Sequence, residues 1–448
     1  MFQKILIANR GEIAVRIIRA CREMGIKTVA VYSEADADAL HTQLADEAVC
    51  IGPAASSESY LNPERILSAT IASKAEAIHP GFGFLSENPK FVEMCEKCHV
   101  AFIGPGADII QKMGNKSEAR ATMIKAGVPV VPGTKKPVFD VDTALKEAKK
   151  IGFPVMIKAS SGGGGKGMRV AENAESFGEM FRLAQRESVN AFGDDTMYLE
   201  KYVGRPRHVE VQILADKFGN VVQLGERDCS IQRRHQKMIE ESPCIAIDAR
   251  LRKKMGDTAV RAAKAVGYEN AGTIEFLLDH TGDFYFMEMN TRIQVEHPVT
   301  EFVSGVDLIK EQIRIAAGEP LSVKQKDIVI RGHAIECRIN AEDPEHNFRP
   351  CPGTVQELHI PGGNGVRIDT ALYSGYKIPP QYDSMLMKVI VHDKDRESAL
   401  AKMRSVLGEV IIDGVQTNID FQFKILNHPE FRAGNVTTHF IPEHFDME

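Results

Sequence analysis

Short apolar runs alternate with stretches of helical spacing in the N-terminal part of the chain. Runs at 4–8 and 27–31 enclose a segment, 13–24, whose apolar positions recur every three or four residues. This order predicts a β-α-β unit. The alternation continues with apolar runs at 49–51, 77–78 and 101–103. Strands that alternate with helices are typical of a parallel sheet, so the pattern predicts an N-terminal α/β domain.

The middle of the chain opens with a predicted helix at 115–126 and a break at 128–133, marked by Pro and Gly, that suits a domain boundary. Strands at 273–278 and 284–289 flank Asp279-His280-Thr281-Gly282, which predicts a hairpin. Between these segments the spacing predicts helices at 141–150 and 251–266, with a further helix after 171, and strands at 155–158, 168–171, 197–202 and 210–214. From Gly332 onward the pattern is strand-rich, with Gly/Pro turns.

Polar side chains of both charge signs recur at every second position after the hairpin. They are Glu288, Asn290, Arg292, Gln294 and Glu296. Because an extended strand turns alternate side chains to one face, we expect these five on a single surface. Such a row is costly to bury without partners, and a metal–phosphate site beside an anion pocket would use all of it.

Residues 160–167 read SSGGGGKG and satisfy G-x-G-x-x-G. The dinucleotide fingerprint requires a helix afterwards, whereas MRVAEN predicts a strand, and a P-loop would require Lys and Ser/Thr after Gly167. We therefore predict a glycine-rich hairpin whose backbone N–H groups approach phosphates, with Lys158 and Lys166 supplying positive charge.

Two carboxylates of the predicted 273–289 hairpin indicate a metal site. With a four-residue loop, Glu275 lies opposite Phe286 and diagonal to Glu288, on one face. Oxygen ligands without nearby cysteine favour one or two Mg²⁺ or Mn²⁺ ions over zinc. A surface ion pair is the weaker interpretation, because Glu275 lies within the otherwise apolar run GTIEFLL.

Composition excludes several classes of protein. The 448 residues are 43% hydrophobic and 26% charged, which indicates a globular protein of about two to four domains. A net charge of −6 without a basic, aromatic-interleaved stripe argues against nucleic acid. No signal peptide or long apolar span is visible, so we expect a soluble cytoplasmic protein without a membrane partner.

The eight cysteines are scattered, which is typical of reduced thiols. Cys95, Cys98 and His99 match the C-x-x-C-H pattern of haem attachment. They fall on a predicted amphipathic helix, and no export signal accompanies them, so we predict a structural role.

Six motifs together resemble the biotin carboxylases, which are ATP-grasp enzymes: NRGEIAVRIIRA, HPGFGFLSEN, KASSGGGGKGMR, RDCSIQRRHQK, EMNTRIQVEHPVTE and ECRINAEDP. The resemblance spans essentially the whole chain. It implies an α/β fold (α+β overall) with a pre-ATP-grasp Rossmann-like domain at 1–113, an ATP-grasp domain at 114–330 and a C-terminal biotin carboxylase domain at 331–446. It also implies a mobile glycine-rich lid at about 130–203.

The resemblance also implies roles for residues that match the family motifs. Glu296 corresponds to the general base, and Arg338 to the residue that stabilises the enolate of biotin. The implied metal ligands are Glu275, Glu288 and Asn290, and the implied biotin contacts are Phe82, Gly83 and Arg338. The implied bicarbonate site comprises Lys237, Arg292, Gln294, Val295 and Glu296. The implied ATP contacts are Lys116, Lys158, Gly164, Gly165, Glu200, Lys201, Tyr202, Val203, His208, Gln232, His235 and Leu277.

Three positions are open to other interpretations. Residues 227–237 concentrate positive charge. A run of charges usually faces solvent, so by itself this run is a weak indication of a binding site. Arg338 lies in an alternating strand, where a structural ion pair is the commoner role. Met387-Lys388 mimics the centre of a biotinyl acceptor, but SMLMKVIV predicts a buried strand and no carrier-sized domain surrounds it. Phe82 stands where some family members have tyrosine.

The function implied is ATP-dependent carboxylation of biotin on a biotin carboxyl carrier protein, with bicarbonate and through carboxyphosphate. ATP, Mg²⁺ or Mn²⁺, and carrier-bound biotin are then required. The chain shows no carrier or carboxyltransferase domain, so both are expected as separate partners of a homodimer. Acetyl-CoA carboxylase is the expected parent enzyme, with another acyl-CoA or pyruvate carboxylase as the alternative.

Three rival functions make different demands on the residues. A carboxylate–amine ligase of the ATP-grasp class would share Lys158, Glu275 and Glu288 but would not need Arg292, Glu296 and Arg338 together. A non-catalytic nucleotide-binding protein is expected to lack the metal carboxylates, which are present. An oxidoreductase is disfavoured because neither glycine-containing turn has the strand-then-helix context of a dinucleotide site.

Overall fold

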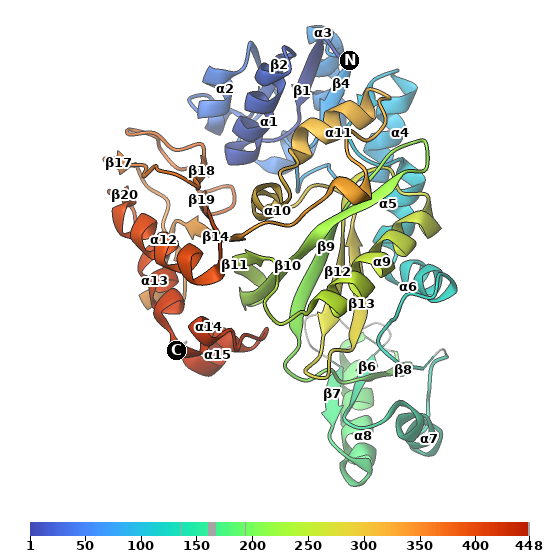
Figure 1. Cartoon of the computed structure of the whole chain (residues 1–448). Coiled ribbons are helices and arrows are strands. Elements are labelled where there is room, and N and C mark those ends of the chain that lie inside the picture. Colours follow the sequence, from blue (N-terminus) through green and yellow to red (C-terminus); the bar gives the residue numbers. More distant parts are fainter. Residues whose placement is uncertain (135, 160–166, 193, 447–448) are drawn as a thin grey trace. The chain divides into compact units, whose positions relative to one another are not determined.

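The computed structural model describes residues 1–134, 136–159, 167–192 and 194–446 (Figure 1). The chain divides into two compact units. The first unit comprises Met1–Val128, Arg207–Phe276 and Glu288–Glu448, and the second comprises Pro129–Pro206 and Leu277–Met287. The predicted break at 128–133 therefore coincides with a boundary between units. Among the described residues, no helix combines the length and the apolar character needed to cross a membrane.

The first unit begins with a parallel sheet of strand order β3-β2-β1-β4-β5. This confirms the predicted α/β arrangement. Asn62 and Asn88 cap the two helices α3 and α4, and each helix has Pro at its first position, as helix starts favour. The strands are β1 (Lys4–Ile7), β2 (Lys27–Tyr32), β3 (Glu47–Cys50), β4 (Ala77–His79) and β5 (Ala101–Phe102), and the main helices are α1 (Gly11–Glu23), α2 (Leu40–Leu44), α3 (Pro63–Ser73), α4 (Pro89–Lys97), α5 (Ala107–Gly114) and α6 (Lys116–Lys125).

A second sheet has the strand order β13-β12-β9-β10-β11-β14-β19-β18. Helix α9 (Ala249–Val266) packs on β9 and β10, and α10 (His297–Ser304) packs on β10, β14 and β19; α11 (Leu308–Ala316) follows. The strands are β9 (Arg207–Ala215), β10 (Val221–Arg233), β11 (Gln236–Ser242), β12 (Asn270–Leu278), β13 (Phe284–Asn290), β14 (His333–Asn340), β18 (Val366–Thr370) and β19 (Met385–Asp393).

The C-terminal part of the chain corrects one prediction. The strand-rich pattern is present, but four helices accompany it: α12 (Arg396–Glu409), α13 (Ile419–Asn427), α14 (Pro429–Ala433) and α15 (Phe440–His444), drawn in red in Figure 1. The apolar positions of α12 that are buried, among them Leu400, Met403 and Leu407, have helical spacing and are readable from the sequence. The five-residue helices α14 and α15 make little more than one turn, too few for a period to show.

The second unit contains an antiparallel sheet of order β7-β6-β8, formed by β6 (Val155–Ala159), β7 (Met168–Ala171) and β8 (Met197–Lys201). Helices α7 (Val141–Ile151) and α8 (Ala174–Phe192) pack on this sheet around the buried residues Phe177 and Phe181. The predicted strands and helices here are confirmed. The turn predicted at 160–166, with Gly164 and Gly165, lies outside the described residues.

Candidate active site

The row of polar residues after the hairpin is an extended strand only at its start. Strand β13 ends at Asn290, residues 291–296 form an irregular segment, and α10 begins at His297. The prediction of one strand from Glu288 to Glu296 is therefore wrong beyond Asn290. Two hydrogen bonds divert the chain: the Thr291 N–H donates to the carboxylate of Glu87, distant in sequence, at 2.9 Å, and the His297 N–H donates back to the Gln294 carbonyl. We refer to residues 291–296 as the 291–296 segment.

The ammonium of Lys237 on β11 contacts acceptor oxygens from several parts of the chain. Its Nζ lies 2.7 Å from both Glu210 and Glu296, 3.1 Å from Glu275 and 3.2 Å from the Gln294 side-chain oxygen. Burial acts to lower the pKa of Lys237, but Glu210 and Glu296 outweigh it and hold that pKa well above its ordinary value. The site therefore contains a permanent cation surrounded by carboxylates.

Glu296 is almost fully buried and lies between two cations. One carboxylate oxygen accepts from Lys237, and the other accepts from Arg338 Nη2 at 2.9 Å. Burial acts to raise the pKa of Glu296, but Lys237, Arg338 and Arg227 outweigh it and hold that pKa well below the ordinary range. The carboxylate is thus ionised, which is the form that a general base requires.

Arg338 on β14 is held by a second carboxylate. Its Nε donates to Glu240 on β11 at 2.6 Å. Burial raises the pKa of Glu240 to about 7, although Arg338 acts to lower it. The guanidinium therefore has two buried carboxylate partners, Glu240 and Glu296. This arrangement is compatible with a structural ion pair and with a catalytic role.

The two predicted metal carboxylates come together beside this site. Glu275 is buried, accepts from Asn290 Nδ2 at 2.7 Å and lies 2.9 Å from His208 Nε2. Burial raises the pKa of the half-buried Glu288, and the neighbouring charge of Glu275 raises it further. The Glu275–Asn290 contact, with Glu288 near enough for its pKa to be raised by the charge of Glu275, fits a hard cation with oxygen ligands. In the described part of the chain, His208, Glu210 and Glu275 also group their ligand atoms within 4.8 Å.

Arg292 lies at the other end of the 291–296 segment. Its Nε donates to Glu87 at 2.9 Å, and its Nη2 donates to Asn290 Oδ1 at 3.3 Å. The structure thus places Arg292 next to Asn290, a predicted metal ligand, whereas Gln294 and Glu296 lie next to Lys237. The 291–296 segment joins both groups.

Comparison with known proteins identifies the family. Three family models match consecutive parts of the chain: the biotin carboxylase N-terminal domain at 1–110, the carbamoyl-phosphate synthase L chain ATP-binding domain at 115–324, and the biotin carboxylase C-terminal domain at 336–443. The chain is 59% identical over 442 residues to biotin carboxylase of Nostoc sp., covering 99% of both chains. The chain belongs to the biotin carboxylase family. The fold class and the ligase function predicted from the sequence, carboxylation of biotin with ATP, are thereby confirmed.

Two further relatives show the range of this family. A pyruvate carboxylase subunit from Methanothermobacter thermautotrophicus is 56% identical over 444 residues, covering 99% of this chain and 90% of the relative. The dimeric biotin carboxylase domain of 2-oxoglutarate carboxylase from Hydrogenobacter thermophilus, solved with MgADP, ADP and bicarbonate, has a TM-score of 0.88 and 50% identity. That match covers 99% of this chain and 98% of the solved one.

The residues predicted to contact ATP occur in both units. In the first unit, Lys116 is exposed, His208 contacts Glu275, Gln232 is buried opposite Lys237, and His235 forms the β10–β11 turn. In the second unit, Lys158 pairs with Glu200, Lys201 Nζ lies 5.8 Å from the Tyr285 ring centroid, and Tyr202, Val203 and Leu277 are half-buried.

Of the predicted biotin contacts, Phe82 is half-buried and packs against the core of the first unit, while Gly83 is exposed with a φ of +69°. The Phe82 carbonyl accepts from Asn9 Nδ2 at 2.7 Å. The backbone of this loop is therefore anchored independently of the Phe82 ring.

Four residues of the site were missed by sequence reasoning. Glu210 and Arg227 form a fully buried ion pair, with Arg227 Nε 2.5 Å from Glu210 Oε1. Glu240 accepts a hydrogen bond from Arg338, and Glu87 accepts one from Arg292. Glu210 lies in the largely apolar run VEVQIL, and the argument applied to Glu275 therefore identifies it too, whereas Glu240 lies in the polar stretch MIEES and is not marked in this way. No comparable signal marks Glu87.

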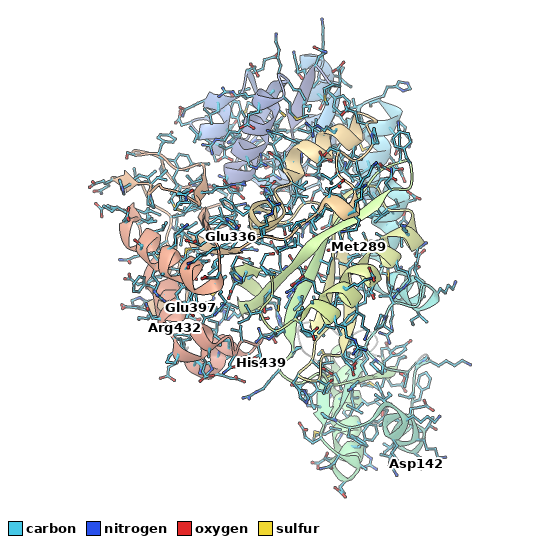
Figure 2. The ribbon with its side chains drawn as sticks, in the orientation of Figure 1. Asp142, Met289, Glu336, Glu397, Arg432 and His439 are labelled. Carbon is cyan, nitrogen blue, oxygen red and sulfur yellow. The ribbon has the colours of Figure 1, made fainter. Side chains whose placement is uncertain are left out.

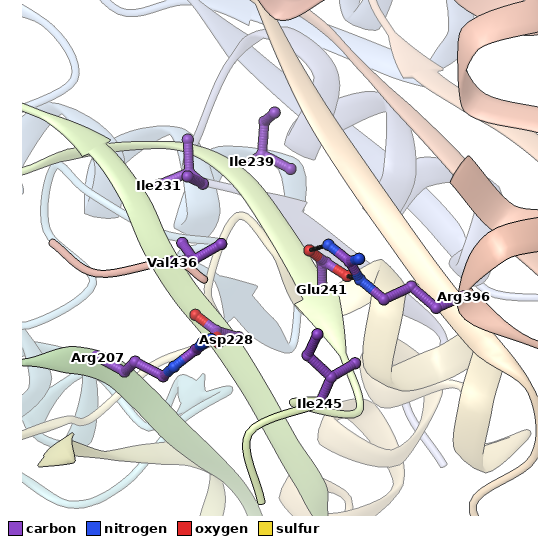
Figure 3. A pocket seen from close by; sticks show the side chains of 8 residues that line it. All are labelled: Arg207, Asp228, Ile231, Ile239, Glu241, Ile245, Arg396 and Val436. Atoms are coloured by element: carbon purple, nitrogen blue, oxygen red, sulfur yellow. Dashed lines mark hydrogen bonds and ion pairs between the residues drawn. The ribbon is translucent and has the colours of Figure 1, made fainter. Parts of the chain in front are cut away.

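A separate cavity in the first unit is too small for a substrate. It is lined by Arg207, Asp228, Ile231, Ile239, Glu241, Ile245, Arg396 and Val436 and measures about 10 Å³, room for about one water (Figure 3). Two ion pairs cross its wall, Arg207–Asp228 at 2.9 Å and Arg396–Glu241 at 2.6 Å. This cavity is therefore structural.

Proposed function

We propose that the chain transfers a carboxyl group from bicarbonate to biotin on a separate biotin carboxyl carrier protein, at the expense of ATP. The observation that carries this proposal is the position of Glu296, a buried ionised carboxylate held between Lys237 and Arg338. Lys237 also contacts Glu275, and Arg338 lies on a separate strand, so the base of the first step lies beside the cation assigned to the second step.

The first step activates bicarbonate. Lys237 and Arg292 attract the anion, and the Gln294 side chain and the Val295 N–H position it. Glu296 takes the proton of bicarbonate as its oxygen attacks the γ-phosphorus of ATP, which breaks the bond to ADP and forms carboxyphosphate. Without proton removal bicarbonate is a poor nucleophile, so the base is essential.

The second step carboxylates biotin. Carboxyphosphate breaks down to CO₂ and phosphate, and the phosphate takes the proton from the ureido nitrogen of biotin, which then attacks CO₂. Arg338 stabilises the negative charge on the ureido oxygen, and Glu240 keeps the guanidinium in place. Phe82 and Gly83 are assigned to the binding of the biotin ring.

Glu275, Glu288 and Asn290 would hold Mg²⁺, or Mn²⁺ in its place. The clustering of oxygen ligands and the raised pKa of Glu288, caused by burial and by Glu275, support this fit. When bound, the ion neutralises charge on the phosphates during transfer.

We assign the remaining features by the resemblance to the family. The domains are 1–113, 114–330 and 331–446, and the homodimer and the carboxyltransferase partner are inferred from relatives. Acetyl-CoA carboxylase is the proposed parent enzyme, and pyruvate carboxylase is the second candidate because of the Methanothermobacter relative. The ATP contacts are Lys116, Lys158, Gly164, Gly165, Glu200, Lys201, Tyr202, Val203, His208, Gln232, His235 and Leu277.

ADP release, measured with bicarbonate in the presence and absence of free biotin, tests this function. We expect biotin to accelerate release in the wild-type chain and Arg338→Ala to abolish the acceleration. Hydrolysis that ignores biotin in both proteins would overturn the proposal.

A further inference from the structure

Lys388 is a fully buried lysine that contacts the 291–296 segment. Its Nζ donates to the Val295 carbonyl oxygen at 2.8 Å. It also lies 3.2 Å from Glu12 Oε1 and 3.7 Å from Asp369 Oδ2. An ammonium is costly to remove from water unless its partners compensate. A lysine in the core of a sheet therefore needs a reason beyond packing.

The strand register places Lys388 beside the site. Lys388 on β19 pairs directly with Arg338 on β14 and with Asp369 on β18. Directly opposite residues extend from the same face of a sheet, so the two cations are neighbours. Arg338 binds the Glu296 side chain and Lys388 binds the main chain of the preceding residue. Two adjacent cations thus hold two consecutive residues of the 291–296 segment.

The surroundings of Lys388 keep it charged and fixed. Burial acts to lower its pKa, but Glu12, Glu336 and Asp369 outweigh it and raise that pKa. Glu336 is fully buried on β14, two residues before Arg338 (Figure 2). Asp369 is itself held by Arg367 through bonds of 2.8 and 2.6 Å. The ammonium therefore has few other positions available.

We propose that Lys388 is a positioning residue for bicarbonate activation. By holding the Val295 carbonyl, it fixes the plane of the Val295–Glu296 peptide and thereby the point from which the Glu296 carboxylate reaches Lys237 and Arg338. The inference rests on the proposed function, since it concerns the same base.

The physical basis is the rigidity of the peptide unit. A planar peptide has soft rotations only at its flanking dihedrals, so a bond to the carbonyl restricts ψ of Val295 and φ of Glu296. On the other side of this peptide, the Gln294 carbonyl accepts the His297 N–H and lies 2.8 Å from His297 Nδ1. The Val295 carbonyl and the Gln294 carbonyl are thus each held by one residue, Lys388 and His297. Loss of the Lys388 bond removes the first of these two restraints. Small displacements of a catalytic group reduce rates by up to about a hundredfold.

The test compares a double variant with a matched control. Lys388→Met with Glu12→Gln removes the donor together with one facing carboxylate, so that the net buried charge is unchanged, and Asp369 keeps its partner Arg367. Glu12→Gln alone retains the bond to Val295. The measurements are kcat and KM for bicarbonate and for ATP, and hydrogen exchange of residues 291–299 in the ligand-free protein.

We expect the double variant to lose about ten- to a hundredfold in kcat/KM for bicarbonate, with the KM for ATP changed less than about twofold. Amide exchange should become faster in 291–299 and stay unchanged in β1 and β2. Glu12→Gln alone should leave both measurements close to wild type.

Unchanged bicarbonate kinetics and exchange in the folded double variant would overturn the inference. A parallel loss for ATP and bicarbonate, with faster exchange throughout the chain, would show a purely structural role and would also overturn it. If the double variant does not fold, Lys388→Gln with Glu12→Gln carries the same expectations, because glutamine is too short to reach Val295. A wild-type chain without bicarbonate-dependent ADP release would refute the proposed function, while the exchange comparison would still test the Lys388 contact.

Discussion

Individual side chains of this site derive their properties from one another. Lys237 stays charged in the interior because Glu210 and Glu296 surround it, and Glu296 stays ionised because Lys237 and Arg338 do. Removing one partner of such a group leaves another buried charge unpaired. Substitutions that keep size and remove only charge or basicity are therefore the informative ones.

Glu296→Gln tests the base directly. The amide keeps the size of the side chain but takes no proton from bicarbonate. We expect bicarbonate-dependent ADP release to fall about 10²–10⁴-fold, as for the loss of a general base, with the KM for ATP nearly unchanged. Steady-state kinetics with both substrates varied provides the measurement, and turnover near the wild-type level would contradict the assignment.

Glu241 gives a pH-dependent prediction away from the site. Burial acts to raise its pKa, but Arg396, drawn beside it in Figure 3, and His333 outweigh burial and bring that pKa to about 2. Because the folded-state pKa lies below the unfolded one, the ionised carboxylate stabilises the fold above about pH 4.3 and loses this effect as pH falls toward 2. Glu241→Gln should therefore cost about 3–5 kcal/mol at pH 7 and progressively less between pH 4.3 and 2.

Denaturant unfolding at several pH values measures this difference. Asp257→Asn is the control, because it removes an exposed ion pair with Lys253 within α9, which contributes less than about 1 kcal/mol. If the difference in free energy of unfolding between wild type and Glu241→Gln stays constant down to pH 2, the assigned pKa shift is wrong.

Helices and strands with clear periodicity were predictable, and the connecting segments were not. The strands of the N-terminal sheet and the β12–β13 hairpin follow from apolar runs and turn residues. The end of β13 at Asn290 does not, because the Glu87 side chain, distant in sequence, takes the N–H of Thr291. Helices α14 and α15 are too short to show a period. The apolar spacing of α12 does predict a helix, but the strand-like pattern of the neighbouring segments leads to a prediction of strands alone.

The sheet of the second unit depends on a compact aromatic core. Phe177 on α8 is fully buried against Phe153 and Phe181. Phe177→Ala should lower the free energy of unfolding of this unit by about 3–5 kcal/mol. Phe139→Ala removes a ring in the same unit that is 54% exposed. This variant should change the free energy of unfolding by less than about 0.5 kcal/mol. Equal stability of the two variants, measured by thermal unfolding, would contradict the assigned core.

Across the whole chain, residues far apart in sequence form one site. The carboxylates around Lys237 come from β9, β12 and the 291–296 segment, and Arg338 comes from β14. The sequence motifs predicted Lys237, Glu275, Glu288, Glu296 and Arg338. Glu87 and the contact of Lys388 with Val295 depend on strand register and loop geometry, which no local pattern encodes.

The proposed role of Glu296 and Lys237 is to make bicarbonate, rather than water, the nucleophile that attacks ATP. Bicarbonate labelled with ¹⁸O tests it in the presence of ATP, Mg²⁺ and biotin, with brief incubation to limit exchange with water. Attack by bicarbonate transfers one labelled oxygen to the inorganic phosphate when carboxyphosphate breaks down. We predict one ¹⁸O atom per phosphate by mass spectrometry. Unlabelled phosphate, formed at the same rate as ADP, would show that water is the nucleophile and that Glu296 and Lys237 do not have this role.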